Sequence, residues 1–393
     1  MTTMTKSSVV KDDSGKKRRR KLIPRIALLG CLALVVVSLG IALSPRSPGE
    51  PAEPPFSEQA RSAALAETMR LRAAGEELGG SASGGAKPAV AQTVSLLTSQ
   101  ARALLLPGQD EPAPTLSPGP ATPSATPSAV PSGAAAAVRS AAPLPSSAAA
   151  LAAALADSAA QRLADAAVAD GGMARLLTAV GTAQLLQSSS LAAAAGSPAP
   201  AGPDPDAPRL SGMCPSAAAS PSTSPAGAAA ASTGASAASA GDGAGAATLP
   251  GALAATVKTE LETLYGYQVA LTRLGGEAAA RASGQLALHE SLATESEALA
   301  RMHCAPVPQR EAGYTMEQEF LASPAAGLGG LEASALPVYG DLVALSEGQT
   351  RQWAIAGLVA AARRSALWGA ETGALPGLAA DPAGFPELPA PGP

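Results

Sequence analysis

The chain has 393 residues, with 40 Gly, 36 Pro and only 2% aromatic residues. Alanine supplies much of the 47% hydrophobic content and buries little area, so the composition argues against a large core and for fewer domains than the length alone allows. Its 27 Lys and Arg against 31 Asp and Glu give a net charge of −4, which argues against a nucleic-acid partner, because phosphate binding needs a basic face.

The N-terminus combines a basic tail, residues 1–22, with a predicted transmembrane helix, residues 23–44. The tail holds the dense basic run 16–21, and the apolar segment 26–43 follows it directly. That segment has roughly 18 residues without a charge, near the lower limit for crossing a bilayer as a helix. Because basic residues stay on the cytoplasmic side, we expect a single-pass cell-membrane protein with a cytoplasmic N-terminus and an extracytoplasmic bulk.

Two alternatives to this span stay open. A signal peptide cleaved at the small residues Gly40-Ile41-Ala42 would give a secreted protein. The stretch Leu28–Cys31 also resembles a lipoprotein cleavage box, with Cys31 as the lipidated residue. However, only Ile26–Gly30 separate Arg25 from that cysteine, whereas the apolar region of a signal needs roughly 7 to 15 residues.

Residues 45–110 are predicted to form a spacer followed by a helical hairpin. The spacer, Ser44–Pro55, is rich in proline and should be extended. Two segments of helix-forming composition follow, Phe56–Leu78 and Val90–Leu106, and the Gly- and Ser-rich loop Gly79–Gly85 separates them. This order predicts an antiparallel pair.

A Pro-, Ser-, Thr- and Ala-rich linker, residues 111–146, leads to a second helical pair in residues 147–195. The linker has too few side chains to bury and is expected to be disordered. The pair comprises Ser147–Ala169 and Met173–Ala195, joined at Asp170-Gly171-Gly172, where a helix would stop and restart. The two pairs could stack into one Ala-rich bundle or lie against the C-terminal region, and the sequence leaves both arrangements open.

Residues 196–250 form another low-complexity linker, in which we expect no packed structure. It contains Cys214. With Cys31 placed in the membrane, Cys214 and Cys304 remain outside, and an even count in an oxidising compartment predicts a disulfide between them. Closing a loop of about 90 residues would remove roughly 4 to 5 kcal/mol of unfolded-state entropy, as an upper figure.

Residues 251–378 have the pattern of four helices, and a Pro-rich tail, residues 379–393, follows them. In the first helix, Leu253, Val257, Glu260 and Leu264 lie on a single stripe that faces neighbouring helices. A carboxylate on that face must be paired, protonated or metal-bound, because burying a bare charge is far too costly. The predicted helices are Leu253–Leu274, Glu277–His303, Leu331–Leu345 with a bend or restart at Pro337, and Glu347–Glu371.

Several short motifs in this region are shared with one family: Tyr265-Gly266-Tyr267 preceded by Glu260, a central His289 in the next helix, Tyr339 in the third, and a last helix ending in Trp368 before Leu375-Pro376-Gly377-Leu378. By these motifs, the region resembles the ferritin-like domain family of unknown function found in actinobacterial envelope proteins. The resemblance implies a four-helix ferritin-like bundle, in agreement with the helix count, and implies no established activity.

Ferritin-like di-iron sites need an inward Glu from each of two helices and a Glu-x-x-His pair from each of the other two. This chain has only two histidines, His289 and His303, and neither follows a Glu by three residues. Glu260, His289 and Glu295 could therefore furnish at most a mononuclear or degenerate metal site. The competing interpretation is that Glu260 pairs with a polar side chain of another helix, such as His289, Tyr339 or Arg351.

No catalytic or cofactor-binding residue is predicted, since the sequence lacks a Cys-x-x-Cys pair, a Gly-x-Ser-x-Gly elbow and a phosphate-cradling loop. The expectation is an all-α, membrane-anchored protein with long disordered linkers and a non-catalytic structural or binding role at the envelope. It would act through self-association or an envelope protein partner and would need no cofactor. The alternatives are a metal-dependent ferritin-like oxidase or metal store, and a sensor or enzyme-partner subunit.

Overall fold

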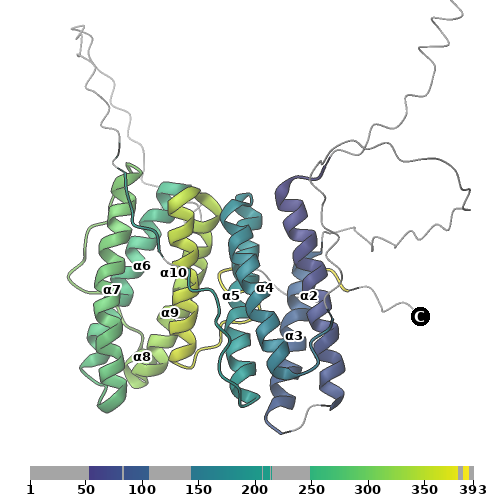
Figure 1. Ribbon diagram of the computed structural model, residues 1–393. Coiled ribbons are helices and arrows are strands. Elements are labelled where there is room, and N and C mark those ends of the chain that lie inside the picture. The colour runs from purple at the N-terminus through teal and green to yellow at the C-terminus, as the bar shows by residue number, and fades with distance from the viewer. Residues whose placement is uncertain are drawn as a thin grey trace, which may run out of the picture. The chain divides into compact units, whose positions relative to one another are not determined.

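Every regular element in the part of the chain that the computed structural model describes is a helix (Figure 1). The described residues are 53–81, 84–105, 143–205, 207–212, 214, 248–378 and 384–388. The all-α class expected from the sequence is confirmed over these ranges, and all of the described helices lie in a single unit, Pro55–Pro393.

The first four helices are α2 (Phe56–Ser81), α3 (Ala86–Leu104), α4 (Ala148–Val168) and α5 (Gly171–Ala194). Helix α2 packs on α3 and α4 packs on α5, while contacts of α2 with α4 and of α3 with α5 join the two pairs (Figure 1). The pairs thus form a four-helix set.

Capping side chains explain where two of these helices begin. The Ser147 hydroxyl accepts the N–H of Ala150 at 3.1 Å, and the Asp170 carboxylate accepts the N–H of Met173 at 3.0 Å. Each cap satisfies a backbone donor that the first helical turn leaves unpaired.

The second set comprises α6 (Leu249–Leu271), α7 (Gly276–Met302), the short α8 (Gln318–Ala322), α9 (Pro324–Leu345) and α10 (Gly348–Leu367). Helix α6 packs on α7 and α9, and α10 packs on α9 (Figure 1).

Helix α9 differs from its prediction at two points. It begins at Pro324 rather than near Leu331, because proline has a backbone geometry suited to the first helical turn. It also continues through Pro337, where we expected a bend or restart. Packing of α9 against α5, α6 and α10 stabilises the helix on several sides, and such tertiary contacts outweigh local propensity.

The largest hydrophobic core joins the two sets of helices. Helix α5 lies against α9, and α10 touches both α4 and α5. The two arrangements that the sequence left open therefore occur together: the first four helices pack on one another and also against the C-terminal region. Buried members of this shared core include Leu163, Leu177 and Val180 from the first set and Leu336, Leu342 and Val343 from the second.

The linker after α5 corrects an expectation. We expected no packed structure in residues 196–250, yet the described residues between 197 and 214, which we call the strap, pack on the helices without regular secondary structure. Leu210 contacts the shared core, Asp204 forms an ion pair with Arg363, and Cys214 is bonded to Cys304 with 5.2 Å between their Cα atoms. These anchors are single residues, which an average over composition does not reveal.

No helix among the described residues is long and apolar enough to cross a membrane. The predicted span, residues 23–44 with Cys31, lies outside the described residues, as do most of the 111–146 linker and residues 216–247.

Candidate functional site

Buried polar side chains from all four long helices of the second set meet in one hydrogen-bonded group, which we call the central network. All of its members are at most 5% exposed to solvent. They are Glu260 and Tyr267 of α6, His289 of α7, Glu332 and Tyr339 of α9, and Arg364 of α10.

In α6 and in α9, helical spacing places an acid and a tyrosine on the same inner face. Tyr267 follows Glu260 by seven residues, and Tyr339 follows Glu332 by seven. Seven residues are close to two turns of an α-helix, so each acid projects from the same side of its helix as the tyrosine that follows it.

His289 bridges the two acids. Its Nδ1 lies 2.8 Å from Oε2 of Glu260, and its Nε2 lies 2.9 Å from Oε1 of Glu332. Since an ionised carboxylate can only accept hydrogen bonds, both ring nitrogens must donate, which requires the imidazolium form. Burial lowers the pKa of His289, but the hydrogen bonds to Glu260 and Glu332, together with the charges of these acids, outweigh burial and raise the pKa overall.

Each carboxylate oxygen of the two acids has a donor. The Tyr339 hydroxyl donates to Oε1 of Glu260 at 2.7 Å. Glu332 accepts the Tyr267 hydroxyl on Oε1 and Nε of Arg364 on Oε2, both at 2.8 Å. Burial raises the pKa of Glu332, but the His289 hydrogen bond and the Arg364 charge lower it overall. Both acids are thus fully satisfied without solvent.

The formal charges of the central network cancel. Two carboxylates face the His289 imidazolium and the Arg364 guanidinium, whose pKa is raised by the Glu332 charge despite the opposing effect of burial. Burial raises the pKa of both tyrosines, so they remain neutral donors. A buried set of charges is stable only when it is paired and hydrogen-bonded in this way.

Aromatic rings pack against the network at both tyrosines. The Tyr267 ring stacks on His289 with 5.0 Å between centroids, and Nε1 of Trp368 donates to the Tyr267 hydroxyl at 2.8 Å. The Tyr339 ring packs on Trp353 at 5.6 Å. These contacts fix the tyrosine rings in the orientation that their hydrogen bonds need.

The central network does not fit the di-metal centre of ferritin-like proteins. A metal needs unprotonated ligand atoms, whereas both nitrogens of His289 donate to carboxylates and a guanidinium lies on Glu332. Nη2 of Arg364 also has no hydrogen-bond partner among the described residues, and an N–H donor repels a cation. Across the described ranges, no group of three or more His, Cys, Asp or Glu side chains is suited to holding a metal ion.

Of the side chains singled out from the sequence, the structure brings Glu260, Tyr267, His289 and Tyr339 together. The prediction that Arg351 could pair with Glu260 is wrong, because the Arg351 guanidinium donates to the backbone carbonyls of Ser346 and Ala169.

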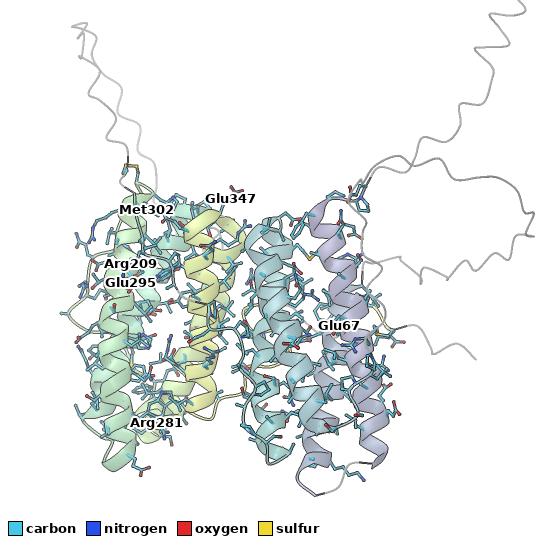
Figure 2. All side chains as sticks on the ribbon, viewed as in Figure 1. Glu67, Arg209, Arg281, Glu295, Met302 and Glu347 are labelled. Atoms are coloured by element: carbon cyan, nitrogen blue, oxygen red, sulfur yellow. A yellow bond between two sulfur atoms is a disulfide. The ribbon has the colours of Figure 1, made fainter. Side chains whose placement is uncertain are left out.

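The third weak metal candidate, Glu295, lies on α7 outside the central network (Figure 2). It accepts Nε1 of Trp353 at 2.8 Å and the Ser291 hydroxyl at 2.9 Å. The second histidine, His303, faces the Thr350 hydroxyl at 2.8 Å. Neither residue contributes to the group around Glu260.

Glu332 and Arg364 were missed. The predicted third helix began at Leu331, which placed Glu332 in a first turn, where a solvated acid is common. The signal that could have found them is spacing: Glu332 precedes Tyr339 by seven residues, and Arg364 follows Gly357 by seven on the inner face of α10.

The largest of the grooves described lies elsewhere, with a volume of about 500 Å³. It runs between α3, α5 and residues 366–374, and its rim carries Ser, Gln and Thr side chains with Glu371 as the single charged residue. No member of the central network lines it.

The comparison with protein families gives one match. Residues 252–380 match the model described as Domain of unknown function (DUF4439). The matched segment is about a third of the chain and contains every residue of the central network. No curated protein and no solved structure matched the chain.

Proposed function

We propose that the chain is a membrane-anchored, extracytoplasmic protein with a non-catalytic structural or binding role at the cell envelope. Its C-terminal region would be a ferritin-like four-helix bundle whose centre is closed by ion pairs. The observation that carries this proposal is the His289 bridge, in which both ring nitrogens are bonded to buried carboxylates.

The central network supports a structural role because its bonds link different helices. Glu260 of α6 reaches His289 of α7 and Tyr339 of α9, and Glu332 of α9 reaches Arg364 of α10. A shift of one helix by a single residue would leave a buried charge unpaired, which is strongly destabilising. The network thus specifies one register of the bundle.

The proposed membrane anchor and the proposed partner are supported by the sequence alone. The basic tail and the apolar segment 26–43 favour a single N-terminal span with the bulk outside the cytoplasm. The partner would be a second copy or another envelope protein, and the near-balanced charge argues against nucleic acid.

Elemental analysis of the full chain, purified from cells supplied with iron and manganese, tests the non-catalytic assignment. We expect well under about 0.2 equivalents of either metal per chain, because the ligand atoms are occupied by protons and by Arg364. Two equivalents that disappear in Glu260→Ala would overturn the proposal.

Protease digestion of intact cells and of permeabilised cells tests the location, since an extracytoplasmic bulk is cut in both.

A metal-binding oxidase or metal store is the alternative, and one observation favours it. Glu260, His289 and Glu332, from three helices, carry side-chain types that metals use, and His289 lies within hydrogen-bonding distance of both acids. This function would require His289 to lose a proton and Arg364 to leave Glu332. The same elemental analysis distinguishes the two functions.

A further inference from the structure

The strap is held at its far end by a cysteine in an unusual backbone position. Cys304 directly follows the C-cap of α7 and has φ 54°, the one positive φ outside glycine among the described residues. The N–H of Ala305 bonds to the carbonyl of Ala300 at 2.9 Å, and the N–H of Cys304 bonds to that of Arg301 at 3.2 Å. This is the Schellman arrangement, in which the left-handed position is usually glycine.

A cysteine at this position places its sulfur at the end of α7, at a conformational cost that glycine would not incur. This sulfur is bonded to Cys214. Met302, the last residue of α7, marks this end of the helix, and a disulfide lies next to it (Figure 2). Cys304 is exposed and Cys214 is half-buried, so a thiol in solution can reach the bond.

The other attachments of the strap to α10 are polar and open to solvent. Asp204 pairs with Arg363, but their side chains are 81% and 39% exposed, and exposed ion pairs contribute little. Gln349, at the start of α10, exchanges hydrogen bonds with the backbone of Ser211. Leu210 supplies the apolar contact with the shared core.

Beside the strap lies an apolar groove of about 240 Å³ between α4 and α10. Leu163 and Ile355 form its helical walls, while Pro203 and Pro205 of the strap form another side. In Figure 1 the strap is visible as an irregular teal trace beside α10. Release of the strap would remove this side of the groove, whose helical lining residues Ala160, Ala164 and Gln352 are already exposed, without breaking a contact between helices.

We propose that the Cys214–Cys304 disulfide is a redox-sensitive clasp, whose reduction releases the strap and removes one side of the groove while the helices stay folded. The reductant is a dithiol. One of its thiolates attacks the sulfur of Cys304, the Cys214 thiolate leaves, and the second thiol resolves the mixed disulfide. The dithiol is oxidised to a disulfide, and Cys214 and Cys304 take up two electrons and two protons.

Hydrogen exchange of the full chain, with and without dithiothreitol, tests the clasp. We expect the amide of Ser211, which donates to Gln349, to exchange at least about tenfold faster after reduction, while those of α4 and α10 keep their rates, as for local opening. Trypsin should then cut after Arg209, because its next residue, Leu210, no longer packs on the core. Unchanged exchange of the Ser211 amide, or an equal rise across α7 and α10, would overturn the proposal.

Two variants separate the effect of losing the disulfide from any other effect of the reductant. Cys214→Ala/Cys304→Ala and Cys214→Ala/Cys304→Gly both lack the disulfide, and the second also restores the residue that the left-handed position favours. Both should show the fast-exchanging Ser211 amide under oxidising conditions, with normal exchange in α7. If either variant keeps a protected Ser211 amide, the disulfide is not the clasp. This outcome is independent of the metal content of the central network.

Discussion

Individual residues explain how the C-terminal helices tolerate four charged side chains at their centre. His289 is 1% exposed and Glu332 is fully buried, yet each charge has an opposite partner within hydrogen-bonding distance. A buried ion pair is not in itself a large source of stability, because desolvation offsets the attraction. Its energetic signature is the high cost of removing one partner.

Glu332→Gln should therefore be strongly destabilising. The change leaves Arg364 and His289 without their shared counter-charge, and we expect a loss of about 3 to 5 kcal/mol in the free energy of unfolding, measured by urea denaturation. Adding Arg364→Met should restore part of that loss. Glu295→Gln is the matched control outside the network and should cost less than about 1 kcal/mol. Equal losses in the two single variants would contradict a special role for the network.

The network also predicts how stability depends on pH. The pKa of His289 is raised on folding, so its contribution is complete below its ordinary value of 6.5 and is lost as pH rises through the folded value. The pKa of Glu332 is lowered, so its contribution is complete above 4.5 and is lost as pH falls through the folded value. Stability should be highest between these limits.

Urea midpoints measured across the pH range test this profile. His289→Gln should flatten the alkaline side, because the variant has no imidazolium to lose. A variant with the same alkaline decline as the parent chain would show that other groups cause it.

At this scale, the sequence pointed to every member of the network except Glu332 and Arg364. The inward position of Glu260 and the burial cost of a carboxylate predicted a polar partner, and His289 and Tyr339 were among those named. Glu332 was hidden because the start of its helix was placed too late. Arg364 was hidden because arginine on a helix is most often solvated.

Among the elements, the close approach of α9 and α10 depends on a glycine. The Tyr339 ring of α9 lies against Gly357 of α10, where a Cβ atom would meet its ring carbons. The absence of a side chain at Gly357 lets the tyrosine reach Glu260 of α6.

Gly357→Ala should therefore destabilise the chain by about 1 to 3 kcal/mol, as overpacking does, although alanine is the better helix former. Gly330→Ala is the control, because that position in α9 has open space around it and no positive φ. We expect this control to be neutral or stabilising by up to about 1 kcal/mol. Thermal unfolding of both variants provides the measurement, and a stable Gly357→Ala would refute the packing argument.

The helices themselves were largely predictable, because Gly, Pro, Ser and Asp mark their ends. Helices α4, α5 and α7 begin and end within a few residues of the predicted bounds. The strap was not predictable, since a few single-residue contacts, namely one ion pair, one leucine, the hydrogen bonds of Ser211 and one disulfide, determine its position within a sequence rich in Pro and Ala.

For the molecule as a whole, the family match and the shared core have different boundaries. The match covers residues 252–380, whereas the core continues into α4 and α5. Side chains of α3 also bind the end of the chain: Gln100 donates to the carbonyl of Ala374 at 3.1 Å and Arg102 to that of Phe385 at 2.8 Å. The sequence could not predict this packing, because an Ala-rich helix face fits many partners.

A fragment of residues 248–393 should therefore be less stable than residues 53–393. Without α4 and α5, the face of α9 that carries Leu336 and Leu342 would lose its cover. We expect the fragment to bind a hydrophobic dye and to unfold at least about 4 °C lower than the longer chain. Equal melting temperatures and no dye binding would show that the matched segment is independent.

The central claim is that the bundle's centre is a charge-balanced network built on a protonated His289. Nitrogen NMR of the full chain labelled on histidine tests it most directly, because His289 and His303 are the only histidines. At about pH 7.5, where a histidine of ordinary pKa is mostly neutral, we predict that both ring nitrogens of His289 carry protons. A neutral His289 with one unprotonated or metal-bound nitrogen would contradict the account.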